Sequence, residues 1–305
     1  MKLAGDRLRN SRPQPDVILL QEVFFPSDLK ILKKRIGDHY VLVDDMPQRF
    51  YPPWFIPILN LGSLFFRFRK SGLAAFVHRR WQVVSSHFEE YRAQGPELKI
   101  WEGDGYAGKG IHRIDLLHHE TRRQLTVFNT HTQSLRAEHQ LRGLQISQLA
   151  AAAYSVDDEI PVLIAGDFNV RPEEPLYEVM TKDFRWIDLT TAMEKCGERL
   201  GYEEGLHEKV NRRRDYIFAL PSAQWRFNTR ASFICNLADD VPYSDHHGIE
   251  ADILVRPRRW QDELSSRSLP NSLPLAILAV QALRGPSTRR AWLLALAALG
   301  WSSRQ

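Results

Sequence analysis

Short apolar runs that end abruptly in polar residues constrain this chain most. The clearest is IPVLIAGDFN, residues 160–169, whose length and closing glycine are typical of a buried β-strand. Similar runs predict further strands in DVILLQEV (16–23), RRDYIFAL (213–220), ASFICN (231–236) and IEADILV (249–255). IHRIDLL and QLTVFNT flank a polar turn, so residues 111–130 are expected to form a hairpin.

Two segments between these runs predict helices. Ser27 is a plausible N-cap for a helix that ends near Ile36, and 134–155 has helical periodicity. The stripe expected to be buried on the second helix consists of Leu141, Leu144, Gln145, Gln148, Leu149 and Ala152. Strands and helices that mix in this way predict an α/β (α+β) domain with two layers of sheet.

Charge and targeting signals narrow the function classes. The formal net charge is +4, but eight Arg against Asp262 and Glu263 make the tail from 256 onward +6, so residues 1–255 carry −2. A body of this charge weakens a nucleic-acid interpretation, because such binding depends on neutralising phosphates. No signal peptide is visible and no run reaches about 20 apolar residues. We therefore expect a cytoplasmic protein, with a peripheral membrane location as the alternative.

Four polar clusters lie at the ends of predicted strands, where α/β scaffolds hold functional side chains. They are Gln21-Glu22, Asn129-Thr-His131, Gly166-Asp167-Phe-Asn169 and Ser244-Asp245-His246. Each alone has an ordinary alternative, since Glu22 could simply end a strand, GDFN could be a turn, and His131 could be a buried histidine.

The order of these clusters is more specific than any one of them. LQEV, NTH, GDFN, R-x-DYIF and SDHxG occur in sequence, and from about residue 16 to 255 the chain resembles the endonuclease/exonuclease/phosphatase superfamily. The resemblance implies a four-layer α/β sandwich with two packed mixed sheets. It also implies hydrolysis of a phosphate ester with a divalent metal, usually Mg²⁺, with Mn²⁺ as an alternative.

The resemblance assigns a role to each cluster. Glu22 resembles the principal metal ligand, and Asp245 a second contributor; hard cations prefer such oxygen ligands. His246 resembles the general base, and Asp215 the carboxylate that holds it. The residues expected to contact the water or the phosphate are Asp167, which positions the water, Asn169, which faces developing charge, Asn129, which binds substrate, and His131, which contacts the same phosphate or helps the leaving group. Lys109, in the Gly-Lys-Gly stretch at 108–110, could also meet phosphate, although a plain turn is an equal alternative.

Two departures from the family pattern stand out. The family's first strand carries an Asn that helps to hold the metal, whereas MKLAGDRLRN resembles the middle of the first helix, so that strand and its Asn are not seen in this sequence. A truncated gene or a wrongly chosen start codon would explain this, whereas a genuine loss of the strand would put stability and activity in doubt. Arg214 occupies a position that is apolar in the family. The expected organisation is a catalytic domain over 1–255, with an insert at 49–70, and an Arg-rich, partly apolar tail over 256–305.

The insert favours a lipid substrate. GDGYAGKGIHRIDL (103–116) and the stretch after His131 are similar to the neutral sphingomyelinase branch. The insert is dense in apolar groups between basic residues, which suits an anionic interface, although a private mini-core is an equal alternative. Its expected membrane contacts are Trp54, Phe55, Phe65 and Phe66.

Three functions stay open at this point. The favoured one is a phosphodiesterase that acts on a phospholipid such as sphingomyelin at a membrane surface. The others are a nuclease or sugar-phosphate phosphatase of the same fold, and an inactive binding protein if the first strand is absent. No protein partner is implied.

Overall fold

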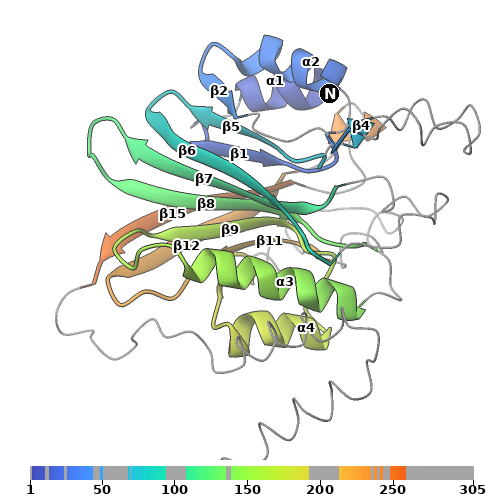
Figure 1. The fold of residues 1–305 in the computed structure, drawn as a ribbon. Helices are drawn as coiled ribbons and strands as arrows, with labels where there is room; N and C mark the ends of the chain where they lie inside the picture. The colour runs from blue at the N-terminus through green and yellow to red at the C-terminus, as the bar shows by residue number, and fades with distance from the viewer. Residues whose placement is uncertain are drawn as a thin grey trace, which may run out of the picture.

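Two β-sheets pack face to face in this chain, and helices cover the outer face of each (Figure 1). The computed structural model describes residues 2–10, 14–23, 26–43, 49–50, 68–69, 71–93, 108–134, 139–191, 213–234, 237–238, 241–242 and 248–258. Most of the aromatic insert, the SDHH motif and nearly all of the tail lie outside these residues.

The larger sheet has six strands in the order β10-β11-β9-β8-β7-β6. Its strands are β6 (Trp81–Glu90), β7 (Gly110–His118), β8 (Gln124–His131), β9 (Val162–Asp167), β10 (Ile187–Asp188) and β11 (Asp215–Ala219). Strands β8 and β9 are parallel and the other neighbours antiparallel. A parallel pair needs a crossover, which α3 (His139–Tyr154) supplies. A short helix, α4 (Pro175–Glu178), and a π-helical turn, η5 (Val179–Asp183), follow β9.

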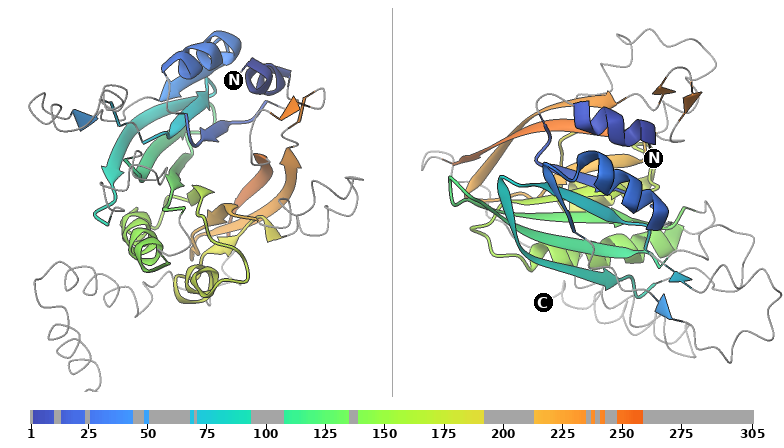
Figure 2. Two further views of the ribbon diagram at one scale, coloured as in Figure 1. Left: turned by 90° about the vertical axis from the view of Figure 1, so that its right-hand side faces the viewer. Right: turned by 90° about the horizontal axis from the view of Figure 1, so that it is seen from above.

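The smaller sheet has three antiparallel strands in the order β1-β5-β2. They are β1 (Val17–Leu20), β2 (Tyr40–Val43) and β5 (Ala74–His78), and they lie beneath α1 (Lys2–Asn10) and α2 (Pro26–Ile36) (Figure 2). A separate ribbon of β12 (Trp225–Ile234) and β15 (Gly248–Pro257) packs beside β11. Two short pairs join β3 (Arg49–Phe50) to β4 (Phe68–Arg69) and β13 (Leu237–Ala238) to β14 (Val241–Pro242).

Strand alternation divides the core into two halves. Phe128 and Ile164 point from the larger sheet toward α3, where they are fully buried with Leu149. Val127 points the other way and packs with Val77 in the layer between the sheets. Burying each large side chain of this kind contributes roughly 1.5–3 kcal/mol, so the two layers together hold the sheets at a fixed distance and register.

The structure confirms the predicted class and its two packed sheets, together with the helix at 27–36 and the hairpin at 111–130. The stripe predicted for α3 was partly wrong. Its buried residues are Arg142, Gln145, Ile146, Ser147, Leu149, Ala150 and Ala153, whereas Leu141 and Leu144 are only partly covered. The helix turns polar side chains inward because they bond to loops, as shown below. No helix among the described residues is long and apolar enough to cross a bilayer.

Candidate functional site

The inner face of the larger sheet changes from apolar to polar along its strands. On β8, Leu125 and Val127 share a face with Asn129 and His131, because alternate residues point to one side. The register pairs His131 with Asp167 of β9, and Asp167 in turn with Asp215 of β11. Directly paired residues share a face. A row of titratable side chains therefore crosses the sheet where β8 and β9 end and β11 begins; it consists of His131, Asp167 and Asp215.

The loop after β1 brings Glu22 to this row. Gln21 Nε2 donates to Asn129 Oδ1 at 2.7 Å, and the Val23 amide donates to the Gly72 carbonyl at 2.8 Å, so the chain is fixed on both sides of Glu22. The backbone of Glu22 has φ 59°, a left-handed conformation that residues other than glycine rarely adopt. Its carboxylate is 60% exposed, with Oε1 3.9 Å from His131 Nε2. Such strain is typical of functional positions.

His131 lies at the bottom of the site, with only 3% of its side chain exposed. Its Nε2 is 3.7 Å from Asp167 Oδ2 and 2.8 Å from Lys109 Nζ. The ammonium has no acceptor capacity, so it donates to Nε2 and the imidazole proton is on Nδ1. Two carboxylates and an ammonium therefore converge on one imidazole nitrogen.

The GDFN motif joins the end of β9 to the loop that follows it, and its glycine and phenylalanine shape this junction. Gly166 has φ 144°, and a Cβ there would lie 1.9 Å from the Thr130 carbonyl oxygen, so only glycine lets β8 and β9 approach at this point. Phe168 is fully buried, edge-on to the rings of Tyr216 and Phe218 at centroid distances of 5.8 and 5.3 Å. This buried ring fixes the loop that carries Asp167 and Asn169.

Asn169 is held by the same loop. It has φ 50°, its backbone amide donates to Asp167 Oδ1 at 2.8 Å, and its Nδ2 donates to the Thr132 carbonyl at 3.1 Å. An amide nitrogen carries two hydrogens, so this bond uses one of them. Asn169 therefore locks the orientation of Asp167 and keeps an amide group beside it.

The strand that carries Asp215 is anchored by a buried ion pair that the sequence did not reveal. Arg213 Nη2 lies 2.8 Å from Asp188 Oδ2, Nη1 donates to Thr190 at 2.8 Å, and the guanidinium lies 4.6 Å from the centre of the Tyr216 ring. Burial raises the pKa of the Tyr216 hydroxyl, which donates to the Val170 carbonyl. Arg213, the first residue of R-x-DYIF, thus anchors the strand. Arg214 is half-buried, and its backbone carbonyl accepts a hydrogen bond from the Phe168 amide.

The structure corrects the expectation that Asn129 contacts the substrate. Asn129 is fully buried, its Oδ1 accepts from Gln21, and its Nδ2 donates to the carbonyls of Leu20 and Ala74 at 3.2 Å each. Its amide ties the two sheets together. Lys109 is likewise 1% exposed and donates to His131 and the Thr132 carbonyl, so its ammonium lies beneath the imidazole and not on an open surface.

Polar side chains of α3 support the loop after β8. Gln145 accepts from the Gln133 amide at 2.8 Å and donates to the Ala93 carbonyl at 2.8 Å. Arg142 donates to the Gln133 carbonyl at 3.3 Å and lies 3.6 Å from Glu174. Helical periodicity found Gln145 but missed Arg142, and it cannot show that either side chain bonds to a loop.

Asp245 and His246 lie outside the described residues, as do Trp54, Phe55, Phe65 and Phe66. Gly248, which follows the SDHH motif, lines the same cavity as Glu22, Gly166 and Asp215. Among the described residues, no group of three His, Cys, Asp or Glu side chains is arranged to hold a metal ion. Mg²⁺ needs only one or two carboxylates with water and substrate oxygens, so Glu22 beside Asp167 suits that ion.

Comparison with known proteins identifies the family and the fold of this chain. Residues 1–246 match the sequence model of the endonuclease/exonuclease/phosphatase family. An inositol phosphosphingolipids phospholipase C from Schizosaccharomyces pombe is 24% identical over 295 residues, covering 84% of this chain and 64% of that protein. This chain therefore spans just under two thirds of the length of that relative.

Two solved structures share the fold. An endonuclease/exonuclease/phosphatase from Bacteroides vulgatus has a TM-score of 0.58 at 17% identity, with 84% of this chain and 90% of that one covered. D. rerio TDP2, complexed with a single-strand DNA product, has a TM-score of 0.52 at 17% identity, covering 78% and 85%. Since the family match extends over most of the sequence, this chain belongs to the endonuclease/exonuclease/phosphatase family.

Proposed function

We propose that this protein hydrolyses the phosphodiester of a sphingolipid head group with the help of a divalent cation. Members of its family are hydrolases that act on phosphoesters. The observation that carries the proposal is the convergence of Glu22 and Asp167 on His131, with two carboxylates within 3.9 Å of one imidazole nitrogen. The named substrate of the Schizosaccharomyces pombe relative supports the lipid class.

The described residues divide into those that meet the substrate and those that position them. Glu22 is exposed and turned by its left-handed backbone toward the site, so its carboxylate is available to a cation. The side chain of Asp167 is 10% exposed, and the backbone amide of Asn169 orients it by donating to its Oδ1. This arrangement suits a carboxylate that accepts a hydrogen bond from an attacking water. The Lys109 ammonium, which donates to His131 Nε2, supplies the positive charge beside these carboxylates.

The family generally uses a divalent metal. In this chain Glu22 would hold it, with Asp245 as the second ligand. A cation held there neutralises the phosphate and polarises its P–O bond. Asp167 would then orient the attacking water. The side-chain amide of Asn169 would donate a hydrogen bond to the charge that develops on the phosphate oxygens.

Proton removal is assigned to His246, oriented by Asp215. Asp215 stands beside Asp167 in the row, and Gly248, two residues after His246, lines the same cavity. If the two residues form a dyad, His246→Ala should slow hydrolysis by about 10²–10⁴-fold. The His246→Ala/Asp215→Asn double variant should be little slower, because Asp215 acts through the imidazole. Multiplicative losses would show that the residues act separately.

The experiment that tests the substrate compares three phosphodiesters under one set of conditions. Sphingomyelin in mixed micelles, single-stranded DNA and a small soluble phosphodiester are each incubated with the full chain, with Mg²⁺ and with chelator. We expect lipid cleavage that chelator abolishes and Mg²⁺ restores. Cleavage of DNA without cleavage of lipid would move the protein to the nuclease alternative, and a chelator-insensitive rate would refute the role of the cation.

Matched variants identify the ligand. Glu22→Gln removes one charge from the site and should raise the Mg²⁺ concentration needed for half-maximal activity steeply. Glu120→Gln removes the same charge from an exposed turn between β7 and β8 and should leave that concentration unchanged. Equal metal dependence in the two variants would show that Glu22 is not a ligand.

Two features of the insert favour a membrane role: its apolar sequence, and the basic residues in the strand pair at its two ends. The β3–β4 pair places Arg49 opposite Arg69, so the insert leaves and returns through two neighbouring basic positions. Basic residues near a membrane are attracted to anionic lipid head groups. Replacing Trp54 and Phe65 with Ser should reduce cleavage of lipid in vesicles and spare the soluble phosphodiester. Equal losses on both substrates would show that the insert is structural.

A further inference from the structure

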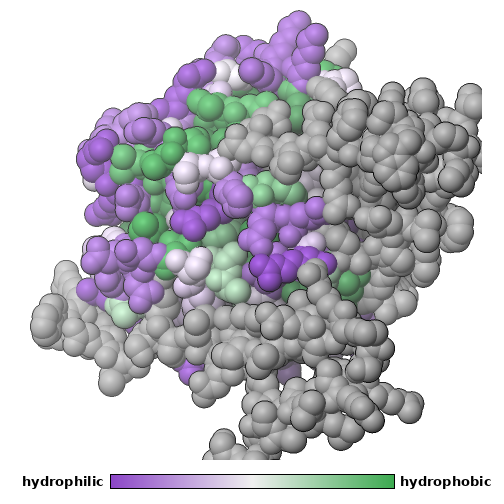
Figure 3. Space-filling model, in the orientation of Figure 1, coloured by the Kyte–Doolittle hydropathy of each residue, from purple (hydrophilic) through white to green (hydrophobic). Residues whose placement is uncertain are grey.

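One glutamine of α3 is fully buried although its side chain is polar. Gln145 is 0% exposed, whereas many hydrophilic residues, in purple, are exposed on the face of the molecule that includes α3 (Figure 3). Burying a side-chain amide is unfavourable unless its polar groups find partners. Gln145 Oε1 accepts from the Gln133 amide and its Nε2 donates to the Ala93 carbonyl, both at 2.8 Å. The helix therefore uses this side chain to hold two loops.

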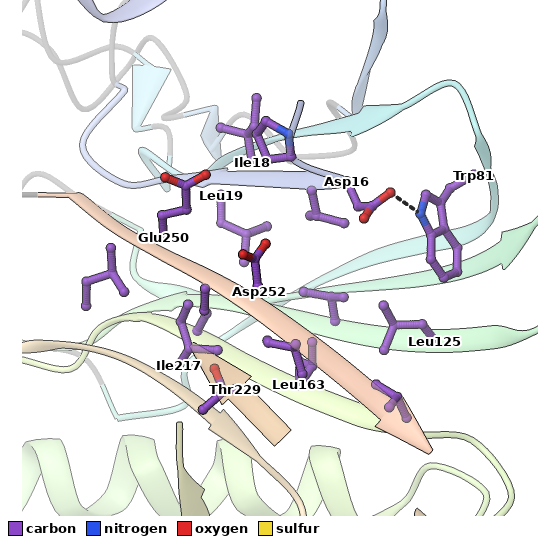
Figure 4. A pocket seen from close by; sticks show the side chains of 18 of the residues that line it. Asp16, Ile18, Leu19, Trp81, Leu125, Leu163, Ile217, Thr229, Glu250 and Asp252 are labelled. Atoms are coloured by element: carbon purple, nitrogen blue, oxygen red, sulfur yellow. Dashed lines mark hydrogen bonds between the residues drawn. The ribbon is translucent and has the colours of Figure 1, made fainter. Parts of the chain in front are cut away.

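This helix lies on the opposite side of the larger sheet from the candidate site. Leu163 and Ile217 point into the space between the two sheets, away from α3 (Figure 4). Asp167 is four positions from Leu163 on β9, and Asp215 is two positions from Ile217 on β11, so both carboxylates face the same way. Gln145 therefore acts from behind the sheet and does not itself contact the substrate.

The N–H that Gln145 holds belongs to the same peptide unit as the Thr132 carbonyl. A peptide unit is planar and almost always trans, so its N–H and its C=O point to opposite sides. The Thr132 carbonyl accepts from Asn169 Nδ2 at 3.1 Å and from Lys109 Nζ at 2.8 Å. Both lone pairs of this oxygen are thus in use. One planar group therefore connects Gln145 on one side to two residues of the site on the other.

The backbone groups on either side of this peptide are held as well. The Thr132 amide donates to the Asp167 carbonyl at 2.9 Å, and the Gln133 carbonyl accepts from Arg142 Nη1 at 3.3 Å. Arg142 lies three residues before Gln145, so the two side chains leave the same face of α3. The N–H of Gln133 has a single hydrogen to donate. Gln145 is thus the group that fixes this peptide on its N–H side.

The direction of the Thr132 carbonyl sets the direction of the Asn169 side chain. Asn169 is 6% exposed, and its Nδ2 donates one of its two hydrogens to this carbonyl. Because the amide group is planar, the second hydrogen points at a fixed angle from the first. Turning the Thr132 carbonyl would therefore turn the hydrogen that faces the phosphate.

We propose that Gln145 is a positioning residue for hydrolysis. Through the Thr132–Gln133 peptide, it aims the Asn169 side-chain amide at the charge that develops on the phosphate. The inference rests on the proposed function, which supplies that charge. A donor aimed at developing charge stabilises the transition state more than the bound substrate. Loss of Gln145 should therefore lower kcat and leave KM nearly unchanged.

The test replaces Gln145 with Met, which has a similar length but no amide group, and Gln148→Met is the matched control. Gln148 lies on the same helix and makes the same two kinds of bond at the end of β6. Its Oε1 accepts from the Arg92 amide at 2.9 Å, and its Nε2 donates to the Glu90 carbonyl at 3.2 Å. No printed bond of Gln148 reaches Thr132, so this variant should keep the kcat of the wild-type chain.

Steady-state kinetics on sphingomyelin in mixed micelles with Mg²⁺ give the first readout. Removing one donor to developing charge costs about 10²–10³-fold in kcat, so a misdirected donor in Gln145→Met should cost at least about 10-fold. The Gln145→Met/Asn169→Ala double variant should be no slower than Asn169→Ala, because Gln145 acts through that amide. Urea denaturation checks that each variant is folded.

A second readout needs no substrate. Selective ¹⁵N labelling of asparagine in the full chain gives NMR signals of the side-chain amides, and the pair that disappears in Asn169→Ala belongs to Asn169. Gln145→Met should shift this pair, because the hydrogen bond to the Thr132 carbonyl changes direction. Gln148→Met should leave the pair where it is in the wild-type chain.

Three results would overturn the inference. They are Asn169 signals that do not move in Gln145→Met, an equal loss of kcat in Gln145→Met and Gln148→Met, and a multiplicative loss in the double variant. Failure of the proposed function is distinguishable from these results. A wild-type chain that hydrolyses no phosphodiester would refute that function, and the NMR signals would still decide whether Gln145 orients Asn169.

Discussion

Replacing Gly166 with Ala tests how the sheet brings Asp167 to His131. The added Cβ would lie 1.9 Å from the Thr130 carbonyl oxygen and 2.9 Å from its carbonyl carbon, both of them backbone atoms. Neither can turn away as a side chain can. The φ of 144° is also a conformation that Ala avoids. The variant must therefore either separate β8 from β9 or unfold.

The magnitude follows from two costs. A residue held in a sparsely populated backbone conformation costs roughly 1–3 kcal/mol. Forcing an extra carbon into a packed position costs roughly a further 1–3 kcal/mol. Gly166→Ala should therefore lower the free energy of unfolding by roughly 2–6 kcal/mol. Domains of this kind have about 5–15 kcal/mol in total, so the loss is a large fraction.

The assay is urea denaturation of the full chain, with Gly143→Ala as the matched control. Gly143 lies within α3, and the nearest atom to its added Cβ is 3.9 Å away, on Leu176. Ala in place of Gly in a helix stabilises by roughly 0.5–1 kcal/mol, so the two variants should change stability in opposite directions. If Gly166→Ala is as stable as Gly143→Ala, the close approach of β8 and β9 is not what this glycine provides.

Further predictions concern the groups that support the site. Phe168→Ala should cost roughly 3–5 kcal/mol of stability by urea denaturation, because it empties a fully buried position; a loss below 1 kcal/mol would contradict its anchoring role. Arg213→Met should cost roughly 3–5 kcal/mol by leaving Asp188 buried without its cation, and adding Asp188→Asn should recover part of that loss. Burial, with the hydrogen bond to Asp188, raises the pKa of Tyr177 from 10.0 to about 12. Stability from the neutral hydroxyl should thus be fully present below pH 10 and lost as pH rises toward 12, which a titration by absorbance and a Tyr177→Phe control would check.

The sequence predicted polar clusters at strand ends because strand ends are local features. An apolar run followed by Glu22 or by GDFN can be read without knowing which strands pair. The pairing of β8 with β9 and of β9 with β11 then brings His131, Asp167 and Asp215 together. The roles assigned to Asp245 and His246 remain predictions, since those residues lie outside the described part of the chain.

Side chains that act over long separations could not be predicted. Asn129 was expected at the substrate as part of the polar cluster at the end of its strand, yet it bonds to Leu20 and Gln21 more than 100 positions earlier. Lys109 was expected to meet phosphate from the Gly-Lys-Gly stretch, with a plain turn as the alternative, but it is buried against His131. Hydrogen-bond partners of this kind depend on how the two sheets are placed, and no local pattern in the sequence encodes that placement.

The placement of the two sheets has a consequence for the site. Glu22 comes from the smaller sheet and Asp167 from the larger, and Asn129 is a bridge that bonds to both. Any change that shifts one sheet relative to the other must therefore change the distance between the two carboxylates that converge on His131.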